Sequence, residues 1–178
     1  MSWYIVYTRY YHERSVYKRL QQKGFEVYLP VTMISRPGKR EVRQVPTPLF
    51  PRYVFVRCYL EMYVHLELIT LPGVLRLLES ARGRFLEVPQ EEMRLLQQLM
   101  SVALSLERAA YPLEGKWMQV ERGPLLGIAG VVCQGSPGTL FVPMPSLHAS
   151  IGVNIGDAPV TPYTDVQKQF SPTHSSDE

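Results

Sequence analysis

The order of apolar runs in the first hundred residues is the feature that most constrains the fold. Trp3–Thr8 is apolar on both faces and rich in β-forming residues, which predicts a central strand. The next segment, His12–Lys23, carries Val16 and Leu20 on one helical face, and Gly24 follows where a helix C-cap is expected. A buried strand followed directly by an amphipathic helix indicates that helices cover a sheet.

Alternating strands and helices are predicted as far as about residue 104. The prolines between Arg43 and Pro51 predict irregular structure there. Further strands are expected at Phe25–Ile34, Tyr53–Cys58 and Val74–Leu78, and helices at Glu61–Leu71 and from Pro89 onward. The resulting order, β-α-β-β-α-β plus a helix, predicts an α+β fold: a ferredoxin-like sandwich with split βαβ topology over residues 1–104.

The character of the chain changes after residue 104. Residues 105–115 are small, charged and punctuated by Pro and Gly, which predicts a linker. Residues 116–163 offer short β-runs separated by turn residues, and we expect an SH3-like β-barrel. Residues 164–178 are polar and Ser-rich, and we expect a disordered tail.

Composition excludes several classes of protein. The net charge of +3 permits contact with nucleic acid without requiring it, and no apolar run is long enough to predict a membrane span. Cys58 and Cys133 form no metal or disulfide pattern, and the four His residues lack partners at ligand spacing. No phosphate-binding or nucleophile motif is present. We therefore expect a cytoplasmic protein with no metal, no cofactor and no enzymatic activity.

The stretch Pro48–Val56 is the first of two informative segments. An exposed Phe50-Pro51 step leads into a strand on which Tyr53, Phe55 and Arg57 share one face. One interpretation is a core strand with a proline at its start. The other is an aromatic docking surface, because Tyr and Phe at a strand rim are favoured interface anchors.

The second informative segment is the loop within Val120–Val132. A strand ends at Gly123-Pro124, and Gly130 leads into a β-branched strand. Glycine at such positions lets the backbone turn and approach another chain segment closely.

Four motifs in the same order resemble the NusG family of transcription factors. The resemblance covers residues 2 to about 160 and implies an N-terminal NGN domain joined to a C-terminal KOW domain. The sequence around Phe50 is more similar to that of RfaH-like specialised antiterminators than to that of housekeeping NusG. The motifs are Trp3-Tyr4, Phe50-Pro51-x-Tyr53, Pro72-Gly73-Val74 and Gly123-Pro124 with Gly130-Val131-Val132.

The resemblance implies that the NGN domain binds the clamp of RNA polymerase and suppresses pausing. The residues matching the family's docking patch are Tyr7, Phe50, Pro51 and Tyr53, and His65 matches a contact to the polymerase gate loop. For Tyr7, ordinary packing within the sheet remains the alternative.

The resemblance also implies contact with the non-template DNA strand of the transcription bubble. The matching residues are Arg9, Tyr10, His12 and Arg14. Cations for phosphate and aromatics for stacking suit single-stranded DNA. A solvated helix N-terminus is the alternative interpretation.

The KOW domain of the family recruits a partner, either Rho or a small-subunit ribosomal protein. The anchor matches Leu147, where NusG proteins place a larger Phe, so we expect weak binding to Rho. The rival of a different class is an RNA- or ribosome-binding KOW protein that acts in translation; a ferredoxin-like enzyme is the third possibility.

RfaH hides its docking patch under a helical form of its KOW domain, which an interdomain ion pair helps to hold. The carboxylate position of that pair is Thr47 here, which cannot form it. Because prolines at 124, 137, 143 and 145 would each disrupt a helix interior, we expect β-structure in this segment.

Overall fold

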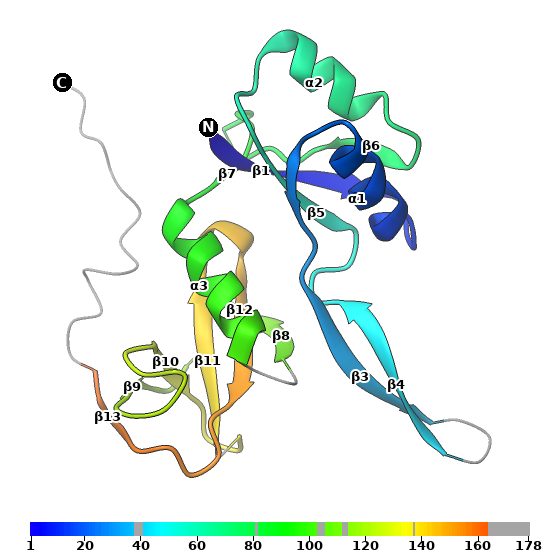
Figure 1. The fold of residues 1–178 in the computed structure, drawn as a ribbon. Coiled ribbons are helices and arrows are strands. Elements are labelled where there is room, and N and C mark those ends of the chain that lie inside the picture. The colour runs from blue at the N-terminus through cyan, green and yellow to red at the C-terminus, as the bar shows by residue number, and fades with distance from the viewer. Residues whose placement is uncertain (38–40, 81, 103–105, 112–113, 137, 164–178) are drawn as a thin grey trace, which may run out of the picture. The chain divides into compact units, whose positions relative to one another are not determined.

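The structure is a computed structural model that describes residues 1–163 except 38–40, 81, 103–105, 112–113 and 137. The chain divides into two compact units (Figure 1). The N-terminal unit comprises Met1–Leu106 and the C-terminal unit begins at Glu107.

The sheet of the N-terminal unit has the predicted split βαβ order. Its main strands lie in the order β2-β5-β1-β6, β7 pairs with β1, and every pairing is antiparallel. The elements are β1 (Ser2–Thr8), α1 (Glu13–Gln22), β2 (Glu26–Tyr28), β5 (Tyr53–Cys58), α2 (Met62–Ile69), β6 (Val74–Leu77), β7 (Glu87–Val88) and α3 (Gln90–Val102).

Two helices share one core against this sheet. Leu20 of α1 and Leu68 of α2 are fully buried with Val6 of β1 and Val56 of β5. Gly24 follows α1 with a φ of +84°, a left-handed conformation that glycine adopts without steric cost. The amphipathic pattern of the sequence therefore placed the helices correctly.

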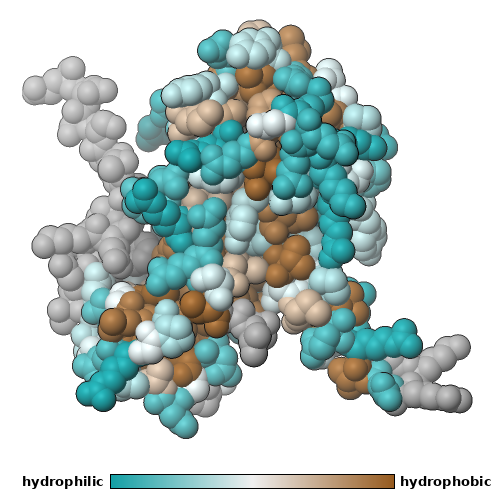
Figure 2. Space-filling model, in the orientation of Figure 1, coloured by the Kyte–Doolittle hydropathy of each residue, from teal (hydrophilic) through white to brown (hydrophobic). Residues whose placement is uncertain are grey.

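The third helix packs against the central strand β1. At its start, the indole N–H of Trp3 donates a hydrogen bond to Gln90 Oε1 over 3.2 Å. Met93, Leu96 and Leu99 are fully buried, which gives α3 one apolar face. Hydrophilic side chains cover much of the drawn face of the N-terminal unit (Figure 2).

A two-stranded hairpin replaces the irregular segment expected at Arg43–Pro51. Strand β3 (Val31–Pro37) pairs with β4 (Val42–Pro48), and the expected single strand Phe25–Ile34 is divided at Pro30 into β2 and β3. The prediction is wrong because a proline excludes a strand only where its nitrogen faces a partner strand. In an isolated hairpin every second residue points its nitrogen away from the partner strand, and Pro46 and Pro48 are two residues apart.

The C-terminal unit contains a six-stranded sheet in the order β13-β9-β10-β11-β12-β8. The pairings from β13 through β12 are antiparallel. The C-terminal segment forms strands β11 and β12 and not a helical hairpin, as the prolines of the sequence predicted. The strands are β8 (Leu106–Ala110), β9 (Lys116–Val120), β10 (Ala129–Val132), β11 (Thr139–Met144), β12 (Ala149–Asn154) and β13 (Val160–Pro162), with the 3-10 turn η1 (Pro145–Leu147) between β11 and β12. Among the described residues β8 and β13 do not pair with each other, so a closed SH3-like barrel stays a proposal.

The segment 105–115, expected as a linker, contains strand β8 at the edge next to β12. Strand pairing by this segment was not visible in its mixed composition. The expected disordered tail, 164–178, lies outside the described residues. No helix in the described part of the chain is long and apolar enough to cross a membrane.

Candidate polymerase- and nucleic-acid-binding surface

A tight turn joins β4 to β5 at the Phe50-Pro51 step. The amide of Tyr53 donates to the carbonyl of Phe50 over 3.2 Å, and Pro51 occupies the second position of the turn. Arg52 at the third position has a φ of +70°. A side chain in this left-handed region costs about 1–2 kcal/mol, so neighbouring contacts must hold the turn in place.

Hydrogen bonds with Glu13 and Thr8 hold Arg52 in this conformation. Its amide donates to Glu13 Oε1 over 2.8 Å, and its carbonyl accepts from the amide of Thr8 over 2.8 Å. Its Nε donates to the carbonyl of Thr8 over 2.9 Å. Glu13 is only 6% exposed, and its hydrogen bond from the Arg52 amide offsets part of the cost of burying this carboxylate in the first turn of α1.

Two arginines and three tyrosines form a cluster at this end of the sheet. The guanidinium carbon of Arg52 lies 4.1 Å from the ring centre of Tyr7 and 4.6 Å from that of Tyr10. Arg76 approaches the Tyr7 ring to 5.6 Å, and Tyr53 meets it edge-on at 5.9 Å. We call these five residues the aromatic–arginine cluster. Each cation over a ring contributes about 0.5–1 kcal/mol at an exposed site.

Strand register brings the cluster together. Tyr7 on β1 lies opposite Tyr53 on β5 and opposite Arg76 on β6. Side chains opposite one another in an antiparallel pair are close enough to interact. The strand register therefore brings together Tyr7, Tyr53 and Arg76, which are more than 20 positions apart in the sequence.

Phe50 is not the exposed residue that the sequence suggested. Its side chain is 1% exposed, stacks on Tyr53 at 6.3 Å and meets Phe55 edge-on at 6.0 Å. Pro51 is exposed and Tyr53 is partly buried. The core interpretation therefore holds for Phe50, whereas Pro51 and Tyr53 remain at the surface. The reason is a turn that directs successive side chains to opposite sides.

The four residues expected to bind DNA lie around the start of α1 but do not act alike. Tyr10 is 62% exposed and belongs to the cluster. Arg9 and His12 lie at the β1–α1 turn, where the Arg9 amide donates to the carbonyl of Gly73 over 2.9 Å. Arg14 donates from Nη2 to the carbonyl of Pro46 over 3.1 Å, which ties α1 to β4.

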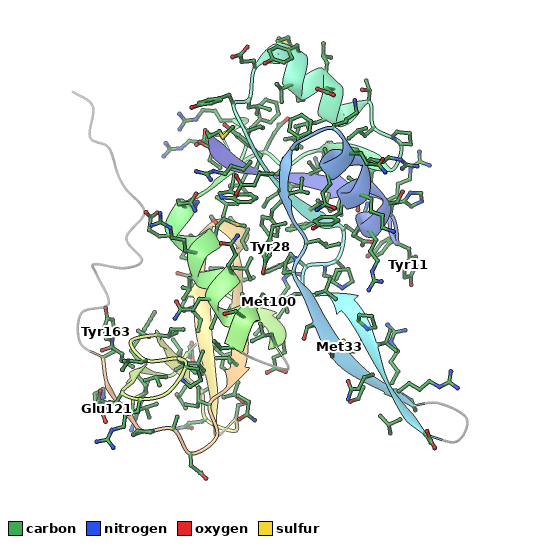
Figure 3. All side chains as sticks on the ribbon, in the orientation of Figure 1. Tyr11, Tyr28, Met33, Met100, Glu121 and Tyr163 are labelled. Atoms are coloured by element: carbon green, nitrogen blue, oxygen red, sulfur yellow. The ribbon has the colours of Figure 1, made fainter. Side chains whose placement is uncertain are left out.

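Tyr11 is a further aromatic residue of this turn that the sequence reading missed. It is 94% exposed with a φ of +63°, and it lies beside α1 in the stick view (Figure 3). A nearly bare aromatic ring in a strained conformation is a candidate for stacking on a partner. The adjacent Tyr-Tyr pair was the available signal.

His65 lies elsewhere in the unit, on α2. Its ring centre is 4.8 Å from that of Phe85, so it packs against an aromatic neighbour. The same helix exposes Met62, Tyr63 and Leu66. The described contacts do not connect His65 with the aromatic–arginine cluster.

The glycine loop of the C-terminal unit has the expected geometry. Gly123, which precedes Pro124, has a φ of +92° between β9 and β10. A Cβ at Gly130 would lie 2.6 Å from the carbonyl oxygen of Phe141 on the neighbouring strand. The close approach of β11 explains why glycine stands at this position.

Leu147 lies in η1 between β11 and β12, the expected position in the chain, but its side chain is 4% exposed. It is therefore not the exposed anchor that the sequence reading expected. A short turn between paired strands folds this apolar side chain inward, and His148 next to it has a φ of +47° and is exposed.

The titratable groups with shifted pKa values lie outside the cluster. Burial raises the pKa of Tyr28 to about 12 and also raises the pKa of the Cys58 thiol. Burial, followed by the hydrogen bond to Glu87, raises the pKa of Tyr4. In the described part of the chain, no three His, Cys, Asp or Glu side chains could hold a metal ion.

The sequence did not indicate three residues of this site. They are the cluster residues Arg52 and Arg76, and Glu13, which holds Arg52 in place. For Arg52 the signal was its place directly after Pro51, where turns with a positive φ at the third position occur. Arg76 and Glu13 gave no local signal, because their roles depend on strand and helix packing.

Solved structures resemble this chain in fold. A structure described as "Domain interaction in Thermotoga maritima NusG" is 23% identical, covers 86% of this chain and 93% of its own, and has a TM-score of 0.52. Two conformations of the MjSpt4:Spt5 complex match more weakly, at 14% and 15% identity over 91% and 90% of this chain and 99% and 97% of theirs, with TM-scores of 0.33 and 0.31. No curated protein matches the chain significantly.

The family comparison covers the N-terminal unit. The family model described as "Transcription termination factor nusG" matches residues 1–97, more than half of the chain. The matched region contains the split βαβ sheet and the aromatic–arginine cluster. The chain therefore belongs to the NusG family of transcription factors.

Proposed function

We propose that this protein is a transcription elongation and antitermination factor that binds the clamp of RNA polymerase through its N-terminal unit. The docking surface comprises Tyr7, Pro51 and Tyr53, with Phe50 as the buried support beneath Tyr53. The observation that carries the proposal is the edge-on contact of Tyr7 and Tyr53 beside the exposed Pro51. Rigid aromatic side chains at a sheet rim provide contact area at low entropic cost.

The cluster also indicates the chemistry of the partner surface. Arg52 and Arg76 approach Tyr7. Their guanidinium groups favour bidentate binding of carboxylates. The proposed partner surface is therefore apolar at its centre and acidic at its margin.

Binding acts on transcription without making or breaking a bond. A factor that binds the closed-clamp polymerase more tightly than the paused form shifts the equilibrium toward the closed form. The shift is limited by the difference between the two affinities. Suppressed pausing is the expected result.

The turn between β1 and α1 is proposed to contact the non-template DNA strand. Arg9 and Arg14 supply positive charge, and Tyr10 and His12 supply rings, next to the exposed Tyr11. Stacking contributes about 1–3 kcal/mol per base and is tolerant of sequence. His65 on α2 is proposed as a separate polymerase contact.

The C-terminal unit is proposed to recruit a partner, either Rho or a small-subunit ribosomal protein. The support is the strand and loop arrangement around Gly123 and Gly130. Because Leu147 is 4% exposed, it would have to move outward to serve as the anchor.

Substitution of one aromatic residue tests the docking proposal. Tyr53→Ala should weaken binding to core RNA polymerase by about 1–3 kcal/mol, the range of an aromatic anchor. The matched control is Tyr111→Ala, because Tyr111 is 36% exposed in the C-terminal unit. Competition binding measures the affinity, and circular dichroism verifies the fold. Unchanged affinity of a folded Tyr53→Ala protein would exclude this surface.

A crosslinking experiment tests the DNA contact. Arg9→Ala with Arg14→Ala should reduce crosslinking to the displaced strand of a bubble template and flatten its salt dependence. Wild-type crosslinking that is equal at low and high salt would contradict the electrostatic contribution.

A further inference from the structure

One cation, Arg52, contacts both surfaces for which binding has been proposed. Its guanidinium carbon lies 4.1 Å from the ring centre of Tyr7 and 4.6 Å from that of Tyr10. Tyr7 belongs to the polymerase-docking surface, and Tyr10 belongs to the turn proposed to contact the non-template strand. The two proposed contacts therefore meet at a single side chain.

The side chain of Arg52 is held from within the unit. Its Nε donates to the carbonyl of Thr8 over 2.9 Å, and its amide donates to the buried carboxylate of Glu13 over 2.8 Å. Among the described residues, no carboxylate forms an ion pair with its guanidinium. The positive charge is therefore presented to the two rings from a fixed position.

Tyr10, by contrast, has little packing of its own. It is 62% exposed, and its other ring contact is with Tyr11, whose ring centre lies 6.2 Å away and which is itself 94% exposed. An exposed side chain loses rotamer entropy when a partner orders it. A ring that is already held by a cation loses less.

The position of the cation leaves room for a base. Arg52 lies over the Tyr10 ring, and a cation within about 6 Å of a ring centre is attracted to the face of that ring. The high exposure of Tyr10 leaves the rest of the ring open to solvent. A base needs one open aromatic face on which to stack.

We propose that Arg52 is a positioning residue for DNA binding, which holds the Tyr10 ring so that a base of the non-template strand stacks on its open face. This inference rests on the proposed contact of the β1–α1 turn with single-stranded DNA. Because stacking tolerates any base but requires one, the contact should depend on the presence of bases and not on their identity.

Binding of the full chain to core RNA polymerase on a bubble template tests the inference. The displaced strand contains either thymines or abasic residues, with the same phosphates in both. The wild type should bind the thymine template at least about fivefold more tightly. Arg52→Gln should lower this ratio about two- to fivefold, the factor that a cation over an exposed ring supplies. Arg52→Lys keeps a cation and the same backbone strain, so it should retain most of the ratio.

The matched control is Arg76→Gln, because Arg76 approaches Tyr7 to 5.6 Å and no described contact joins it to Tyr10. This variant should weaken binding to both templates and leave their ratio unchanged. Arg52→Gly removes the cation and relieves the strained backbone, so it should show the lowered ratio even if Arg52→Gln folds poorly. In a Tyr10→Ala background, Arg52→Gln should lower the ratio no further.

Several outcomes would overturn the inference. They are an unchanged ratio in folded Arg52→Gln or Arg52→Gly, an equal fall in Arg76→Gln, or a further fall in the Tyr10→Ala background. Circular dichroism verifies the fold of each variant. Wild-type protein that binds both templates equally would refute this inference but leave polymerase docking intact, whereas wild-type protein that binds neither template would refute both.

Discussion

The guanidinium carbon of Arg52 lies 4.1 Å from the ring centre of Tyr7. This contact joins a residue in a strained turn to the central strand of the N-terminal sheet. Because hydrogen bonds with Glu13 and Thr8 hold both the backbone and the Nε of Arg52, the cation is positioned before any partner arrives. A preorganised surface loses less conformational entropy on binding.

Two substitutions of Arg52 distinguish the cost of its backbone strain from the contribution of its cation to polymerase binding. Arg52→Gly should be more stable than Arg52→Ala by about 1–2 kcal/mol, since only glycine adopts the φ of +70° freely. Both variants should bind polymerase more weakly than the wild type, because both lack the cation. Urea unfolding and competition binding measure the two effects. Equal stability of the two variants would show that the turn relaxes.

Phe50 and Tyr53 should behave differently despite their stacked rings. Phe50 is 1% exposed, so Phe50→Ala should lower the free energy of unfolding by about 3–5 kcal/mol. Phe50→Leu should cost less, because it leaves a smaller cavity. Thermal unfolding monitored by circular dichroism tests this order. A Phe50→Ala protein as stable as the wild type would mean that the ring is not part of the core.

Glu13 should matter as a hydrogen-bond acceptor. Glu13→Ala leaves the Arg52 amide without its partner and should destabilise the unit by about 1–3 kcal/mol. Glu13→Gln keeps an oxygen acceptor, so it should cost less. Urea unfolding of the two variants distinguishes them. If both cost the same, the negative charge rather than the hydrogen bond is required.

Gly130 should tolerate no side chain. Because a Cβ there would lie 2.6 Å from the Phe141 carbonyl oxygen, Gly130→Ala should loosen the β10–β11 pairing by about 1–3 kcal/mol. Gly123→Ala is the control, since its Cβ would meet nothing within 4 Å and only its φ is strained. Amide hydrogen exchange in β10 and β11 reports the local stability. Equal protection in both variants would rule out the steric argument.

The raised pKa of Tyr28 predicts that the free energy of unfolding falls at alkaline pH. Its pKa of about 12 in the folded protein exceeds the ordinary value of 10.0, so above pH 10 the unfolded chain releases a proton that the folded chain keeps. The stabilisation is complete below pH 10 and is lost as the pH rises toward 12. Tyr28→Phe should show a shallower fall of unfolding free energy over this range. An identical fall would assign the effect to other groups.

Local patterns in the sequence were sufficient for most of the N-terminal elements. The helical face of α1, with Val16 and Leu20, and the strand Tyr53–Cys58 appear where they were predicted. Hydrophobic periodicity works here because each helix buries one face against the sheet, whereas β1 and β5 are apolar on both faces. Proline was misleading at β4, because its effect depends on which side of a strand is free.

The sequence by itself determined the family and the order of most N-terminal elements, and it predicted roles for Tyr7, Tyr53 and the glycine loop. Only the tertiary structure decided that Phe50 and Leu147 are buried. It also placed Arg52 and Arg76 around Tyr7. The physical reason is that side-chain periodicity is a local property of the chain. Burial and charge pairing are set instead by which distant strands lie side by side, and in which register.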